Sequence, residues 1–206
     1  METVNDVGRM RIVGGSLALD YVNTRSGPPA GPPDDDVLHR YDDLVAWARH
    51  AGVVTEPEAA RLRRQARARP DDARDLFQRA LGVRDHLDAL FRTVATGGRP
   101  SGRQLARLSG DTAEALAHAQ LVLGDGHYRW RWTGHQDLGR PLWPVVHAAA
   151  ELLTTGPLER IKTCSGCRFV FVDESKNRSR RWCSMEDCGT AAKIRRYVAR
   201  RAASRH

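Results

Sequence analysis

Four cysteines constrain the fold of this chain more than any other feature. They lie after residue 157 in a sequence of 206 residues and form two pairs, Cys164 with Cys167 and Cys183 with Cys188. The pattern, C-x2-C followed after fifteen residues by C-x4-C, is close to those that supply four thiolates to one tetrahedral metal ion. It therefore predicts one structural Zn2+ held by all four cysteines, because four protein ligands leave no open position for catalysis.

Other interpretations of the cysteines are an iron–sulfur cluster, a redox C-x-x-C pair, and unligated thiols in a core. A redox pair normally opens a helix, whereas Cys167 is followed by Phe169–Val172, a run typical of a strand. Gly166 also suits a tight turn around a metal. The sequence favours zinc, with iron as the open alternative.

The net charge is concentrated in the same part of the chain. Residues 158–206 contain 13 Lys and Arg against 5 Asp and Glu, which accounts for the whole formal net charge of +8. Residues 1–157 are balanced and contain no cysteine. We therefore expect two domains with different functions, 1–157 and 158–206, separated at Gly156-Pro157.

A hairpin and a helix are predicted around the cysteines. Phe169–Val172 can pair with residues 180–182 across a polar turn, which would return Cys183 to Cys167. Ser184 is a suitable N-cap for a helix that follows, with basic residues on one face. Its opposite face carries an apolar stripe of Ala191, Ile194, Val198 and Ala202. The segment is expected to be a treble-clef or ribbon-like zinc module.

The basic residues of this module form a candidate DNA-binding surface. An α-helix fits the major groove of DNA, where arginine can reach base edges while lysine contacts phosphate. The simpler interpretation is a solvated basic tail that binds any polyanion weakly. The candidate residues are Lys176, Arg178, Arg180, Arg181, Lys193, Arg195, Arg196, Arg200 and Arg201.

Specific runs of residues also carry a family resemblance. The pair Cys164-x2-Cys167 and the run Trp182-Cys-Ser-Met-Glu-Asp-Cys-Gly189 resemble the CGNR zinc finger of bacterial proteins regarded as transcription regulators. Upstream, Gly14–Thr24 is similar to the ABATE domain that accompanies this finger in a stress-induced regulator family. The resemblance implies that the four cysteines bind zinc and that the finger binds DNA. At the name-giving Cys-Gly-Asn-Arg motif this chain has Thr190 and Ala191 in place of Asn and Arg.

The first 157 residues are predicted to be mainly helical. Apolar residues at helical spacing predict helices over 17–22, 38–48, 55–68, 76–94, 101–116 and 144–153. Residues 120–123 and 127–132 are predicted to form a hairpin, and residues 10–13 a short strand. The proline-rich segment 26–36 is predicted to be a loop, with residues 34–36 at the start of the next helix. The expected fold class is α+β, a predominantly helical N-terminal domain with a small β-hairpin plus a C-terminal zinc finger of four cysteines.

Several function classes are disfavoured. Eight histidines are scattered without ligand spacing, and no P-loop, G-x-G-x-x-G or G-x-S-x-G motif occurs, so we do not expect an enzyme. No apolar run approaches the roughly 18 residues of a membrane span. The first residues also lack the basic segment followed by an apolar segment that is typical of a signal peptide, so we expect the protein to be cytoplasmic.

The leading hypothesis is a transcription regulator that binds double-stranded DNA. The helical domain would dimerise, because a single finger has a small footprint, or would sense a small apolar effector between Trp47, Trp130, Trp132 and Trp143. The alternative is a protein-interaction or RNA-binding module without sequence-specific DNA binding.

Overall fold

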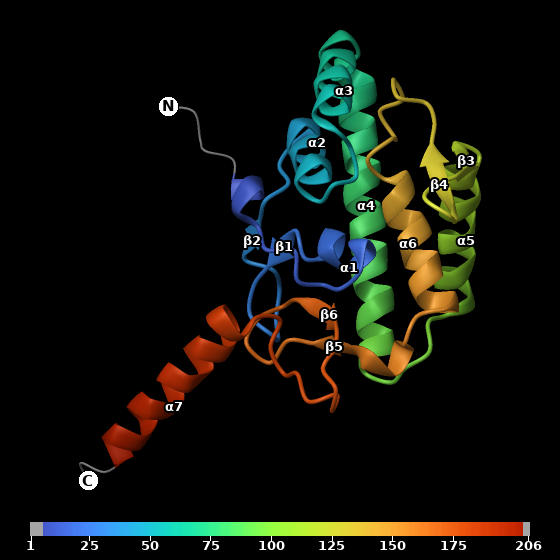
Figure 1. Ribbon diagram of the computed structural model, residues 1–206. Coiled ribbons are helices and arrows are strands. Elements are labelled where there is room, and N and C mark those ends of the chain that lie inside the picture. The colour runs from blue at the N-terminus through green and yellow to red at the C-terminus, as the bar shows by residue number, and fades with distance from the viewer. Residues whose placement is uncertain (1–5, 204–206) are drawn as a thin grey trace.

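The computed structural model describes residues 6–203, within which helices predominate and three small antiparallel sheets occur (Figure 1). The helices are α1 (Leu17–Val22), α2 (Tyr41–His50), α3 (Glu56–Ala68), α4 (Pro70–Ala95), α5 (Gly102–Leu116), α6 (Trp143–Thr154) and α7 (Thr190–Ala203). Shorter turns are the 3-10 helices Asp6–Arg9 and Leu158–Arg160 and a π-helical turn, Met185–Gly189. The strands are β1 (Arg25–Ser26), β2 (Asp35–Asp36), β3 (Ala119–Leu123), β4 (Tyr128–Trp132), β5 (Ile161–Thr163) and β6 (Val170–Val172). The predicted α+β fold class is confirmed.

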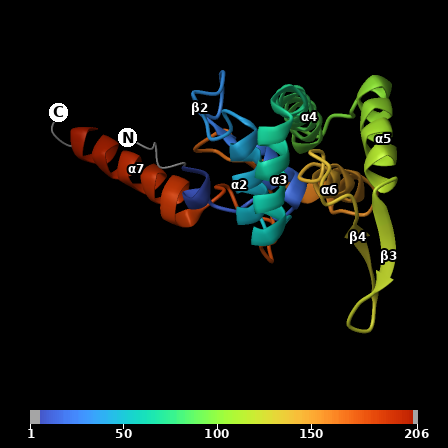
Figure 2. The same ribbon diagram turned by 90° about the horizontal axis from the view of Figure 1, so that it is seen from above.

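The long helix α4 organises the molecule. It has 26 residues and packs against α1, α2 and α3, and also against β5 and β6 of the C-terminal segment. Helix α6 packs against α1 and α5, and the β3–β4 hairpin extends from α5. Seen from above, α7 extends from one end of the molecule and the β3–β4 hairpin from the other (Figure 2).

Local capping interactions set the helix boundaries that the sequence predicts. Thr55 accepts a hydrogen bond from the backbone N–H of Glu58, whose carboxylate accepts the backbone N–H of Thr55 at 2.8 Å. Ser101 and Gln104 form the same reciprocal arrangement at the start of α5. Each pair satisfies two backbone donors that the first helical turn leaves without partners.

One hydrophobic core joins the helices to the C-terminal segment. Besides helical residues such as Leu19, Leu44 and Leu87, it contains Ile161 from β5 and Val172 from β6. A smaller cluster around Phe171 and two of the cysteines lies beside it. The cysteine-containing segment is therefore packed directly on the helical part.

The predicted pairing of Phe169–Val172 with residues 180–182 is wrong. Strand β6 instead pairs with β5, in the register Ile161 opposite Val172. Residues 174–180 fold around the buried carboxylate of Asp173, which accepts the backbone N–H groups of Ser175 and Arg180. These hydrogen bonds hold the chain in a compact loop that cannot continue as a hairpin.

Two smaller predictions near the N-terminus are also wrong. Residues 10–13 form no strand, because the backbone N–H of Val13 and Gly14 donate to the carboxylate of Asp20 and make no ladder. Residues 34–36 do not begin a helix. Asp36 lies in β2 and accepts two hydrogen bonds from the buried guanidinium of Arg84, which fixes it well before α2 begins.

Candidate metal centre and nucleic-acid interface

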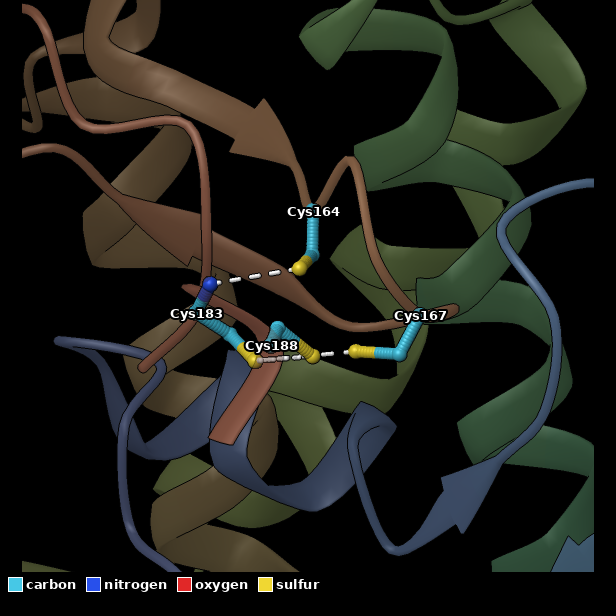
Figure 3. A group of neighbouring side chains, drawn as sticks. All are labelled: Cys164, Cys167, Cys183 and Cys188. Carbon is cyan, nitrogen blue, oxygen red and sulfur yellow. Dashed lines mark hydrogen bonds between the residues drawn. The ribbon is translucent and has the colours of Figure 1, made fainter. Parts of the chain in front are cut away.

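The four cysteine side chains converge on one point (Figure 3). Their sulfur atoms all lie within 4.8 Å of one another, with Cys167 Sγ 3.5 Å from Cys183 Sγ and Cys183 Sγ 3.8 Å from Cys188 Sγ. A zinc ion with bonds of about 2.3 Å to four sulfurs would separate them by roughly 3.8 Å. The spacing therefore fits a tetrahedral Zn2+ site, and it is far longer than the roughly 2.0 Å of a disulfide bond.

Two separate stretches of chain supply the sulfurs. Cys164 follows β5 and Cys167 precedes β6, whereas Cys183 precedes the π-helical turn and Cys188 lies within it. Gly166 allows the two stretches to meet, since a Cβ at this position would lie 2.9 Å from the Cβ of Cys188. Any side chain there would push the two halves of the site apart.

The thiols cannot all ionise without a cation. Hydrogen bonds from Cys167 and Cys183 lower the pKa of Cys164, whose sulfur also accepts the backbone N–H of Gly166 at 3.3 Å. The pKa values of Cys167 and Cys183 are raised instead, and the hydrogen bond to Cys164 raises that of Cys167 to about 12. Four thiolates at this spacing need a divalent cation, which is the donor chemistry of a structural zinc site. The finger can hold one zinc ion.

Arg180, a predicted DNA contact, is engaged inside the finger. Its half-buried guanidinium lies 4.3 Å above the centre of the Phe171 ring. It donates hydrogen bonds to four backbone carbonyl groups, those of Val13, Val172, Trp182 and Cys183. These contacts tie the N-terminal segment, β6 and the second cysteine pair together.

The neighbouring basic residues point to solvent. Arg181 is exposed, with its guanidinium 5.5 Å from the centre of the Trp182 ring. In the preceding loop Lys176 and Arg178 are also exposed, and Arg178 forms an ion pair with Glu159 at 3.2 Å. The sequence predicts the same role in DNA contact for all four basic residues. In the structure, Arg180 is half-buried inside the finger and the other three lie at its surface.

Helix α7 carries the other predicted contacts and is exposed along most of its length (Figures 1 and 2). Its basic residues are Lys193, Arg195, Arg196, Arg200 and Arg201, and it contains no acidic residue. The expected apolar stripe is present but not packed on the protein, because Ile194 and Val198 are each 58% exposed. Both the basic and the apolar face of α7 are therefore accessible.

Sequence reasoning missed two groups that hold the finger in place. Arg11 pairs with Glu186 at 2.6 Å and with Asp187 at 3.1 Å, across the start of the π-helical turn. Arg168, next to Cys167, donates to the buried carboxylate of Asp88 in α4. No sequence signal marks these pairs, since their members lie 80 or more residues apart.

Arg168 also holds the proline-rich loop. Its backbone N–H donates to the carbonyl of Gly27 at 2.9 Å, and its side chain to the carbonyl of Gly31 at 3.1 Å. Asp88 accepts a further hydrogen bond from Arg92 at 2.7 Å. One arginine therefore joins the first cysteine pair, α4 and the loop.

The four tryptophans have different surroundings. Trp47 is fully buried and contacts Tyr21, with ring centres 4.9 Å apart. Trp143 stacks on His118 at 3.9 Å and borders a separate cavity of about 130 Å³. Trp130 and Trp132 contact His147, which lies four residues after Trp143 in α6. None of the helices among residues 6–203 has the length and apolar character required to cross a membrane.

Comparison with known families agrees with this geometry. Residues 15–156 match the ABATE family, described as "Putative stress-induced transcription regulator". Residues 160–201 match the CGNR zinc finger. Both are regulator or zinc-finger families rather than enzyme families. No curated protein matches the chain.

Proposed function

Because this chain belongs to the ABATE family and carries a CGNR zinc finger, we propose that it is a transcription regulator that binds double-stranded DNA through this finger. The observation that carries the proposal is the placement of α7. The helix begins directly after Cys188 and Gly189, extends away from the protein, and has five basic and no acidic side chains. Such a helix fits the DNA major groove, and its charge favours contact with phosphate.

In this proposal the metal has a structural role. A zinc ion bound by Cys164, Cys167, Cys183 and Cys188 cross-links β5, β6 and the π-helical turn that precedes α7. The residues themselves orient the helix. Arg180 ties the cysteine segment to β6, and Arg11 holds Glu186 and Asp187 at the turn. These contacts anchor the π-helical turn from which α7 continues.

The test is selection of genomic DNA fragments at near-physiological salt by the protein with its metal content measured. We expect a defined motif to be enriched by the zinc-loaded protein and lost in Cys183→Ser, which removes a ligand and unfolds the finger. Enrichment that is equal with and without metal would contradict a role for the finger.

A double variant tests α7 itself. Arg196→Ala with Arg200→Ala should keep zinc, weaken DNA binding and lower the salt dependence, because phosphate contacts release counterions. Arg64→Ala with Arg67→Ala removes the same charge from exposed positions on α3 and should leave binding nearly unchanged. Retained affinity in the α7 variant would refute the assignment of this helix to DNA.

The exposed apolar face of α7 favours one alternative. Ile194, Tyr197 and Val198 are more than half exposed, as expected for a module that docks on a protein partner. That module would bind DNA or RNA without sequence preference, and the fragment selection would then return no motif.

The helical part would supply regulation in our proposal, through a small effector or through a homodimer, with the cytoplasm as the site of action. A cleft of about 330 Å³ lies between the N-terminal segment, β2 and the finger, with Met10, Val37 and Phe169 in its lining. Its size is at the lower end of the range for small-molecule sites. Measuring the molar mass with and without DNA tests the dimer.

A further inference from the structure

The finger also contains a pocket next to its basic helix. A pocket of about 260 Å³ lies between the first cysteine pair, the segment before Cys183 and the start of α7. Its lining consists of Ser165, Arg181, Trp182, Ala192, Arg195 and Arg196. Three parts of the finger, which are separate in sequence, meet there.

The pocket is strongly cationic. Three of its six lining residues are arginines and none is acidic. Within residues 6–203, no ion pair involves Arg181, Arg195 or Arg196, although Arg196 Nε donates to the carbonyl of Ala192 at 3.4 Å. Three guanidinium groups around one hollow repel one another unless an anion lies between them.

Neighbouring residues help to position these three arginines around the pocket. The backbone N–H of Ser165 donates to the carbonyl of Arg181 at 2.9 Å, which ties that residue to the loop of the first cysteine pair. The guanidinium of Arg181 also lies over the Trp182 ring, and Trp182 packs on the cluster around Phe171. Arg195 and Arg196 lie in the second turn of α7. Zinc-dependent folding would therefore position all three arginines together.

A phosphate is the anion that this arrangement fits. Guanidinium groups bind phosphate oxygens with paired, charge-assisted hydrogen bonds. The volume is below the roughly 300 Å³ at which sites for whole small molecules begin, which disfavours a complete nucleotide. Ala192, Arg195 and Arg196 of its lining lie on α7, so the pocket borders the helix that would enter the groove.

We infer that this pocket binds one backbone phosphate of DNA and so sets the register of α7 along the groove. This inference rests on the proposed function and adds to it a defined anchoring site. Phosphate contacts fix the position of a protein on the duplex, while base contacts read the sequence. Ser165 and Trp182, which the sequence does not mark as DNA contacts, become part of the interface.

The test uses duplexes of the selected motif in which single phosphates are replaced by neutral methylphosphonates. With the full zinc-loaded protein, we expect one position at which neutralisation weakens binding about tenfold or more. Arg181→Ala with Arg195→Ala should bind more weakly and should no longer respond to neutralisation at that position.

The matched control is Lys193→Ala with Arg200→Ala, which removes the same charge from α7 outside the pocket. This variant should lose affinity but keep its sensitivity to the same phosphate. Zinc content and helical circular dichroism should be equal in all proteins. If the pocket variant keeps the wild-type sensitivity, the pocket assignment is overturned while DNA binding stands.

Two further outcomes separate the sources of failure. If the zinc-loaded wild-type protein binds no duplex, the proposed function and the pocket assignment both fail. Inorganic phosphate should compete with DNA more strongly than chloride of equal ionic strength, because it can enter the same pocket, and Arg181→Ala with Arg195→Ala should remove this difference. If phosphate binds through Arg181 and Arg195 without displacing DNA, the pocket binds free phosphate and the assignment to the DNA backbone is overturned.

Discussion

Arg180 and Arg181 are adjacent in sequence and carry the same charge. We expect their replacement by alanine to change the stability of the finger by very different amounts. Arg180→Ala removes hydrogen bonds to four backbone carbonyls and the contact with the Phe171 ring. Arg181→Ala removes an exposed guanidinium over Trp182. Comparing the two variants therefore tests whether Arg180 stabilises the finger from inside while Arg181 lies at its surface.

The expected loss for Arg180→Ala follows from these contacts. A hydrogen bond contributes about 0.5–1.5 kcal/mol net, and a cation–π contact at a partly exposed site about 0.5–1 kcal/mol. Since the Arg180 side chain is half-buried and water can reach some of the carbonyls, we expect the finger to lose roughly 3–5 kcal/mol. Arg181→Ala should change stability by less than about 0.5 kcal/mol, as is usual for surface substitutions.

The assay is competition for zinc with a chelator, combined with urea unfolding. Because zinc binding and finger folding are coupled, Arg180→Ala should weaken the apparent zinc affinity by about a hundredfold or more. Arg180→Lys should recover little, since an ammonium group cannot reproduce the fork of donors. If Arg180→Ala and Arg181→Ala bind zinc equally well, the structural role of Arg180 is refuted.

Two further predictions concern the helical part. Asp88→Asn should weaken the contact of Arg168 with α4, so amide hydrogen exchange at Arg168, whose N–H donates to the carbonyl of Gly27 at 2.9 Å, should accelerate while zinc content stays the same; unchanged exchange would contradict this connection. Burial opposes ionisation of Glu58, but hydrogen bonds from Thr55 and the nearby Arg140 hold the pKa of its carboxyl below the usual value. Its stabilisation should be present above about pH 4.3, the unfolded pKa, and be lost as pH falls through the folded pKa. In urea titrations between about pH 3 and pH 6, Glu58→Gln should therefore show a flatter pH dependence than the wild type, and parallel curves would exclude this role.

Elements governed by neighbouring residues were predictable. The reciprocal caps Thr55 with Glu58 and Ser101 with Gln104 set the starts of α3 and α5. Their partners are three residues apart, so the pattern is readable in the sequence. The β3–β4 hairpin follows for the same reason, because turn residues separate two short runs.

Pairings between distant segments were not predictable from pattern alone. Phe169–Val172 has the composition of a strand, but its partner depends on which neighbouring segment is buried against α4. Ile161 opposite Val172 places both residues in the main core, whereas Trp182 packs against the smaller cluster around Phe171. Burial therefore decided between two pairings that the local sequence allowed.

For the site, the sequence by itself determined the metal chemistry, because the spacing of the four cysteines and the glycine between the first two fix which ligands meet. It also determined that the charge gathers in the last quarter of the chain. Only the tertiary structure decided how that charge is used. It turns Arg180 inward to backbone carbonyls, directs Arg181 with Arg195 and Arg196 to one pocket, and leaves the apolar face of α7 uncovered. The physical reason is that charge and periodicity are local properties, whereas the direction in which a side chain points depends on which distant segments are packed around it.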